Sequence, residues 1–154
     1  MALALGPDLH DKRVLVLGNE DQLERHQGFL DEWGGDIPPL LEFCPFDRAA
    51  ARELADRTIR RATAEFQGIF GVSDEIALGA VQAVSGRGHN TVVIGCDGTS
   101  AATLLVDLKN TPLINTVVQD SYTMGEKAIA ILKRQMASKA VTKQKEILAA
   151  RMYV

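Results

Sequence analysis

Short runs of β-branched and apolar residues alternate with helical patterns along almost the whole chain. The predicted strands occupy residues 13–19, 38–43, 68–72, 91–96 and 115–119, with one more extended segment at 146–154. The predicted helices occupy residues 21–33, 47–62, 73–84, 100–108 and 122–136. Strands that are apolar on both faces and separated by crossover helices are typical of a parallel sheet that is covered on both sides. The pattern therefore predicts a doubly wound α/β fold, with helices on both faces of a mostly parallel sheet of five or six strands in the flavodoxin-like order 2-1-3-4-5.

The chain is long enough to form one domain with its own core. Its 154 residues are 46% hydrophobic, and a chain of this length buries roughly 70% of its unfolded surface. We expect residues 1–154 to form a single α/β domain, with residues 1–12 as a poorly ordered leader. The formal net charge of -3 argues against a general nucleic-acid or membrane-surface binder. The start has no basic region of a signal peptide, which predicts a cytoplasmic location if the chain is the complete product.

The cysteines and histidines do not form a recognisable metal or disulfide framework. Cys44 and Cys96 lack metal-ligand spacing, and the histidines, His10, His26 and His89, are scattered. In the predicted strand order the two cysteines lie three strand spacings apart, roughly 14 Å, which exceeds the ~7 Å limit for a disulfide. We therefore predict two free thiols, no metal site and no cofactor.

Polar and aromatic residues follow several of the predicted strands. In "VVIGCDGTS" (92–100) a buried strand ends on a carboxylate held between small residues. Ligands of doubly wound sheets bind outside the carboxyl ends of the strands, and the candidates near that edge are Arg25, Phe46, Ser73, Asp97 and Gln119. Paired hydrogen bonds and a flat apolar ring suit a polyol. Each candidate also has a structural alternative: a solvated helix residue for Arg25, a cover over the end of the core for Phe46, and a helix cap for Ser73 or Asp97.

Several motifs resemble the periplasmic sugar-binding proteins of the ribose-binding type. They are "FQGIFGVSDEIALGAVQAV", "VVIGCDGTSAA", "NTVVQDSYTMGEKA", "FDR" and "ERHQGF", the last being similar to the Arg-x-x-Gly-Phe pattern of that family. The resemblance covers about residues 13–154, and it extends to the effector-binding core of lactose-repressor-type regulators. It implies that Arg25 and Asp97 bind sugar hydroxyls, that Phe46 stacks on the sugar ring, and that Gln119 lies at the interlobe crossing. Ser73 departs from the pattern, because the family often has Asn there.

The resemblance also implies that the chain corresponds to the second of two lobes. The first lobe, which would close over the ligand, has no counterpart in this sequence. In the family the helix after Gln119 packs on the first lobe. Here the apolar face of the helix at 122–136, formed by Met124, Ala128, Ile131 and Leu132, is expected to pack on the chain's own sheet or on another copy of the chain.

The resemblance favours binding of a monosaccharide, as half of a periplasmic protein for ABC-type sugar uptake or chemosensing, with a membrane permease as partner. Binding by the isolated chain is expected to be weak or absent. The alternative is the effector-binding half of a transcription regulator, although "CDGT" and "VVQD" favour the transport type. Neither function requires this domain to contact nucleic acid.

An enzyme on the same architecture is disfavoured. Asp97 with Glu20 and Asp21 suggests an aspartyl phosphate site, but no lysine follows the fifth strand to neutralise the phosphoryl group. The sequence also has no glycine-rich phosphate cradle and no Ser–His–Asp or Cys–His arrangement that can be argued. We therefore expect a binding protein that is not an enzyme.

Overall fold

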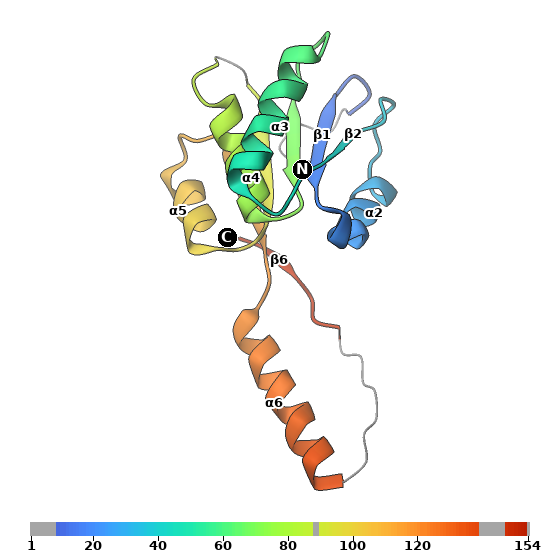
Figure 1. Cartoon of the computed structure of the whole chain (residues 1–154), viewed down its shortest axis with the longest axis vertical. Coiled ribbons are helices and arrows are strands. Elements are labelled where there is room, and N and C mark those ends of the chain that lie inside the picture. The colour runs from blue at the N-terminus through green and yellow to red at the C-terminus, as the bar shows by residue number, and fades with distance from the viewer. Residues whose placement is uncertain (1–8, 88–89, 139–146, 154) are drawn as a thin grey trace.

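A six-stranded sheet forms the centre of the molecule in the computed structural model, which describes residues 9–87, 90–138 and 147–153. The elements are β1 (Val14–Gly18), the 3₁₀ turn η1 (Glu20–Gln22), α2 (Leu23–Asp31), β2 (Leu40–Phe43), α3 (Arg48–Arg61), β3 (Gly68–Gly71), α4 (Asp74–Val84), β4 (Val92–Asp97), α5 (Ser100–Leu108), β5 (Leu113–Val118), α6 (Ser121–Ser138) and β6 (Arg151–Met152) (Figure 1).

The strand order is β2-β1-β3-β4-β5-β6, and every pair is parallel except β5 with β6. This confirms the predicted fold class and the order 2-1-3-4-5. Right-handed crossovers place α3, α4 and α5 on one face of the sheet, because all three connections advance in the same direction across it. The connection from β1 to β2 runs the other way, so α2 covers the opposite face.

The core lies between the sheet and the α3–α4 layer. All five residues of β1 are buried, and α4 is buried over most of its length. Gly79 lets α4 approach α3 closely, because a Cβ there would lie 2.5 Å from the carbonyl oxygen of Arg48. Gly71 does the same for β3 and α4, since its Cβ would meet the backbone nitrogen of Ala77 at 2.6 Å. These contacts fix the height of α4 on the sheet, and with it the turn that precedes α4.

The differences from the predicted elements are small and lie at the ends. The first helix starts with a 3₁₀ turn and ends at Asp31 rather than residue 33, and β2 begins after the two prolines. The last extended segment contributes only the two residues of β6. Residues 1–8 of the predicted leader lie outside the described residues, so its order is not tested.

Helix α6 corrects one expectation. It does not pack on the chain's own sheet; it projects from the carboxyl end of β5 and stands clear of the helices that cover the sheet (Figure 1). Its described side chains from Ser121 to Ala137 are exposed or partly exposed. No helix among the described residues is both long and apolar enough to cross a membrane.

The two cysteines are free, as predicted, and both are buried. Cys44 follows β2 and Cys96 lies in β4. Burial raises the pKa of both thiols above their ordinary value of 9.0, and nearby carboxylates add to the effect at each.

We expect a thiol titration to find no disulfide: two reactive groups in the unfolded chain and slow reaction in the native protein. The thiolate is the reacting species, so a raised pKa means that the native reaction rate still increases with pH above 9.0. A native rate that levels off at or below neutral pH would contradict the buried environment.

Candidate functional site

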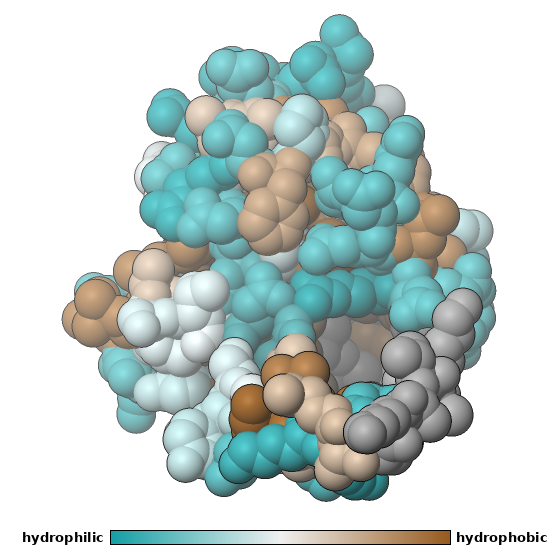
Figure 2. Space-filling view, turned by 60° about the horizontal axis from the view of Figure 1, so that its bottom comes forward, coloured by the Kyte–Doolittle hydropathy of each residue, from teal (hydrophilic) through white to brown (hydrophobic). Residues whose placement is uncertain are grey.

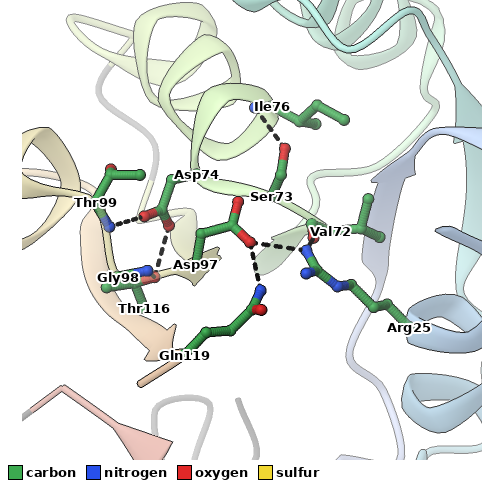
Figure 3. A network of polar contacts seen from close by, with 10 residues as sticks. All are labelled: Arg25, Val72, Ser73, Asp74, Ile76, Asp97, Gly98, Thr99, Thr116 and Gln119. Carbon is green, nitrogen blue, oxygen red and sulfur yellow. Dashed lines mark hydrogen bonds and ion pairs between the residues drawn. The ribbon is translucent and has the colours of Figure 1, made fainter. Parts of the chain in front are cut away.

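Three of the predicted residues meet at the carboxyl edge of the sheet. Asp97 ends β4, Gln119 follows β5, and Arg25 lies in the first turn of α2. The Nη1 atom of Arg25 is 3.1 Å from Oδ1 of Asp97, and Nε2 of Gln119 donates to the same oxygen at 2.8 Å (Figure 3). Arg25 Nη1 also donates to the carbonyl oxygen of Val72, which ties α2 to the end of β3. We call Arg25, Asp97 and Gln119 the edge cluster.

The edge cluster is open to solvent but held in place. The side chains of Arg25 and Asp97 are 28% and 27% exposed. Arg25 and Gln119 both contact Oδ1 of Asp97, and no hydrogen bond from a described residue reaches Oδ2. Figure 2 brings this end of the molecule forward and shows hydrophilic residues across the middle of the face. The cluster can therefore offer a carboxylate oxygen, a guanidinium and an amide to a small polar molecule.

The turn after β4 holds Asp97 in an unusual conformation. Its φ is 136°, a region that side-chain-bearing residues rarely adopt, and φ of Gly98 is 75°. A Cβ at Gly98 would lie 2.9 Å from the side chain of Val118. The turn is closed by the amide of Gly98, which donates to Oγ1 of Thr116 at 3.3 Å, and by the amide of Gln119, which donates to the Asp97 carbonyl at 3.4 Å.

A buried carboxylate supports this turn from the interior of the domain. Asp74, at the start of α4, is 0% exposed. It accepts hydrogen bonds from the amide of Thr99 and from the hydroxyl of Thr116, both at 2.6 Å (Figure 3). Gly95 makes room for it, because a Cβ there would clash with the Asp74 carboxylate. Asp74 thus joins α4, β5 and the turn that carries Asp97.

The structure separates two candidates from the edge cluster. Ser73 is 0% exposed, and its hydroxyl accepts from the amide of Ile76 at 3.3 Å. This corrects its prediction as a ligand-binding residue: the side chain is a helix N-cap, the alternative that the sequence left open. Phe46 is 53% exposed in the loop between β2 and α3. No contact between Phe46 and the edge cluster is seen in the described part of the chain.

Sequence reasoning missed Asp74 and Thr116. An acidic residue in the first turn of a helix is favoured by the helix dipole alone, so "SDE" gave no sign that the Asp74 carboxylate turns inward. The only available signal was Gly95, a glycine inside a buried strand, which marks a close approach of another group.

No group of His, Cys, Asp or Glu among the described residues is arranged to hold a metal ion. His10 contacts Asp36 on the surface, and His26 is buried against the backbone of its own helix. His89 lies outside the described residues.

Comparison with known proteins identifies the family. A family described as periplasmic binding protein domain matches residues 6–140, most of the chain. The chain belongs to this family. The predicted resemblance is confirmed at the level of the family.

Individual relatives agree with the assignment. The ribose import binding protein RbsB of Bacillus subtilis (strain 168) is 32% identical over 83 residues, which are 54% of this chain and 26% of that protein. The structure of an ABC transporter solute-binding protein from Burkholderia multivorans has a TM-score of 0.83 at 16% identity, covering 99% of this chain and 55% of its own. A LacI family transcriptional regulator from Arthrobacter sp. FB24, in complex with lactose, has a TM-score of 0.73 at 27% identity, covering 93% of this chain and 55% of its own. The chain spans about half the length of these solved structures.

Proposed function

We propose that the carboxyl edge of this domain binds a monosaccharide. In this proposal residues 1–154 correspond to one lobe of a two-lobed periplasmic sugar-binding protein that serves ABC-type uptake or chemosensing. The observation that carries it is the convergence of Arg25 and Gln119 on one oxygen of Asp97, which leaves Oδ2 to accept from a ligand. A permease and a periplasmic location belong to the same proposal.

Each residue has a role that its chemistry supports. Asp97 accepts from sugar hydroxyls, Arg25 and Gln119 donate to them, and Phe46 stacks on the C–H face of the ring. Phe46 is 53% exposed in the loop that follows the carboxyl end of β2, so its ring face is available to pack against an apolar surface. Ser73 is left out because its hydroxyl is buried and already bonded.

One open edge is expected to bind weakly. Four or five hydrogen bonds at about 1 kcal/mol net each, with about 1 kcal/mol from stacking, give 5–6 kcal/mol gross. The loss of translational and rotational freedom costs at least about 4 kcal/mol. The remainder corresponds to millimolar affinity or weaker.

Titration with ribose, followed by the backbone amide NMR shifts of the chain, tests this proposal. We expect shifts at Asp97, Gly98 and Gln119 with a millimolar dissociation constant, and none at the opposite edge of the sheet. An apolar alcohol of similar size serves as the control. Saturation at micromolar ribose, or shifts that avoid the edge cluster, would contradict the proposed site.

The second candidate is the effector-binding half of a LacI-type regulator. It is supported by the 27% identity to the Arthrobacter regulator, whereas the transport-type relative RbsB is 32% identical over 83 residues. The two candidates share the edge cluster and differ in their context. A signal peptide encoded in frame before residue 1 supports transport, and a helix-turn-helix supports regulation.

A further inference from the structure

One carboxylate oxygen of the edge cluster is available to a cation. Asp97 Oδ1 contacts Arg25 and Gln119, whereas Oδ2 accepts no hydrogen bond from the described residues and is in contact with solvent. A carboxylate oxygen binds an ammonium group more strongly than a neutral hydroxyl, because both partners of the hydrogen bond are then charged. The open position of the cluster therefore favours a ligand with a protonated amine.

The arginines at this edge are already paired. Nη1 of Arg25 lies 3.1 Å from Asp97 Oδ1 and also donates to the carbonyl oxygen of Val72. Arg48, at the start of α3, pairs with Glu75. A carboxylate or phosphate on the ligand would have to displace Asp97 from Arg25 and would then lie beside a second negative group, which is unfavourable. An anionic sugar is therefore disfavoured at the same position.

A hollow at the same edge of the sheet is lined by acids and by no base. It has a volume of about 340 Å³ and lies at the carboxyl ends of β1 and β2. Glu20 and Asp21 line it and are exposed, and neither pairs with a basic residue in the described part of the chain. The other lining residues are Asn19, Phe43, Cys44 and Pro45.

The two acids of this hollow are near enough to act on a ligand at Asp97. Strands β1 and β4 are separated by β3 alone, so their ends are about 10 Å apart. This distance is about the Debye length at 0.1 M salt. Glu20 and Asp21 therefore add to the negative potential at Asp97 Oδ2, and more strongly at lower salt.

The bases beyond β5 face an acid of their own. Arg151 of β6 lies near Asp120, whose pKa is lowered chiefly by hydrogen bonds from the amide and hydroxyl of Thr123, with Arg151 adding to the effect. Lys127 of α6 lines a separate hollow together with Asp120. These two bases are thus on the side of the edge cluster away from Glu20 and Asp21.

We propose that the ligand of the edge cluster is an amino sugar, bound with its ammonium group on Oδ2 of Asp97. Glu20 and Asp21 lie outside the contact and attract the ammonium group through their field. A neutral sugar binds at the same position without this gain, and a sugar acid binds more weakly still. This inference names the chemical class of the ligand and rests on the sugar site proposed above.

The expected selectivity is moderate because the site is open to solvent. Exposed ion pairs contribute little, so the amine should lower the dissociation constant about fivefold relative to the matched neutral sugar. The same charges should raise the dissociation constant of a matched sugar acid. The Debye length falls to about 3 Å at 1 M salt, so these differences should shrink there, while the affinity for the neutral sugar stays the same.

NMR titrations of the 154-residue chain with glucosamine, glucose and glucuronate test the proposal. At about pH 6 the amine is protonated, and the three molecules share one ring and differ in charge. We expect shifts at Asp97, Gly98 and Gln119, with glucosamine binding about fivefold more tightly than glucose and glucuronate more weakly. Equal affinities for glucosamine and glucose, or tighter binding of glucuronate, overturn the proposal. Glucose binding without a preference for the amine leaves the sugar site in place, whereas no shift with any sugar removes the site as well.

Neutralising the acids of the hollow tests the role of the field. Glu20→Gln combined with Asp21→Asn should lose about half of the glucosamine gain at low salt and leave the affinity for glucose unchanged. Asp31→Asn combined with Glu32→Gln is the matched control, because it removes the same two exposed charges at the other end of α2, about 13 Å away. Equal glucosamine affinities of the two double variants, or an equal loss for glucose, overturn the role given to Glu20 and Asp21.

Discussion

Replacing Asp74 by alanine is expected to lower the free energy of unfolding by about 4 kcal/mol. The buried carboxylate accepts two hydrogen bonds of 2.6 Å, and hydrogen bonds to charged groups contribute about 1.5–3 kcal/mol each. The variant also leaves the Thr116 hydroxyl and the Thr99 amide without their acceptor in the interior. Urea unfolding at one fixed protein concentration measures the change, because association alters apparent stability.

Glu75 provides the control for this prediction. It lies next to Asp74 and makes a bidentate pair with Arg48, with Nη2 and Nε donating at 2.7 and 3.1 Å, but both side chains keep about two fifths of their surface exposed. Exposed ion pairs contribute at most about 1 kcal/mol, so Glu75→Ala should change the stability little. Equal losses for the two variants would show that the buried network does not hold the turn. Thr116→Val should produce part of the Asp74→Ala loss, since it removes one of the two donors.

The strand order and the meeting of the edge cluster could be predicted because they depend on patterns spread along the chain. Apolar runs identify the strands, and crossover handedness limits their arrangement. Once the order is known, Asp97 and Gln119 must lie side by side, since they end the neighbouring strands β4 and β5. To predict that Arg25 joins them, the first helical turn after β1 must be placed as well. The resemblance supplied that step.

The roles of Ser73 and Asp74 could not be separated in this way. Both residue types are favoured at a helix start. The direction of the Asp74 carboxylate depends on Thr99 and Thr116, which are 25 and 42 residues away in the chain. Local pattern carries no information about such partners. The pattern therefore predicts a ligand-binding role for the Ser73 hydroxyl. It predicts no role for the Asp74 carboxylate, which supports the site.

The position of α6 could not be predicted for a related reason. Its helical pattern is evident from the spacing of its apolar residues, and the helix is present from Ser121 to Ser138. A pattern identifies the face that needs cover but not the surface that supplies it. Most doubly wound sheets would be covered on both faces by their own helices. Here the chain's last helix projects from the carboxyl end of β5 instead (Figure 1).

Asp74 and Asp97 have different roles at the site. The buried acid uses its hydrogen bonds to hold the turn, so that the exposed acid can keep one oxygen for a ligand. Catalytic and binding residues are often held in strained conformations by well-packed surroundings. The φ of 136° at Asp97 fits this pattern, and the strain can be tested separately from the carboxylate.

Two substitutions of Asp97 are expected to abolish ribose binding while differing in stability. Asp97→Ala and Asp97→Gly both remove the carboxylate, and the loss of two hydrogen bonds at about 1 kcal/mol each should weaken binding by about 30-fold. Millimolar binding would then fall below detection in the NMR titration. Glu20→Ala, an exposed acid on the same edge, should bind ribose as the wild type does. Wild-type binding by either Asp97 variant would remove Asp97 from the site.

The stability of the same two variants reports on the backbone. Alanine at position 97 keeps the strain of a positive φ, whereas glycine adopts this conformation without a Cβ clash. A strained residue costs about 1–3 kcal/mol, and glycine returns part of this through its larger freedom in the unfolded chain. Asp97→Gly should therefore be more stable than Asp97→Ala by about 1 kcal/mol in urea unfolding. If the alanine variant is equally stable or more so, the turn relaxes without its carboxylate, and the edge cluster itself imposes the conformation of Asp97.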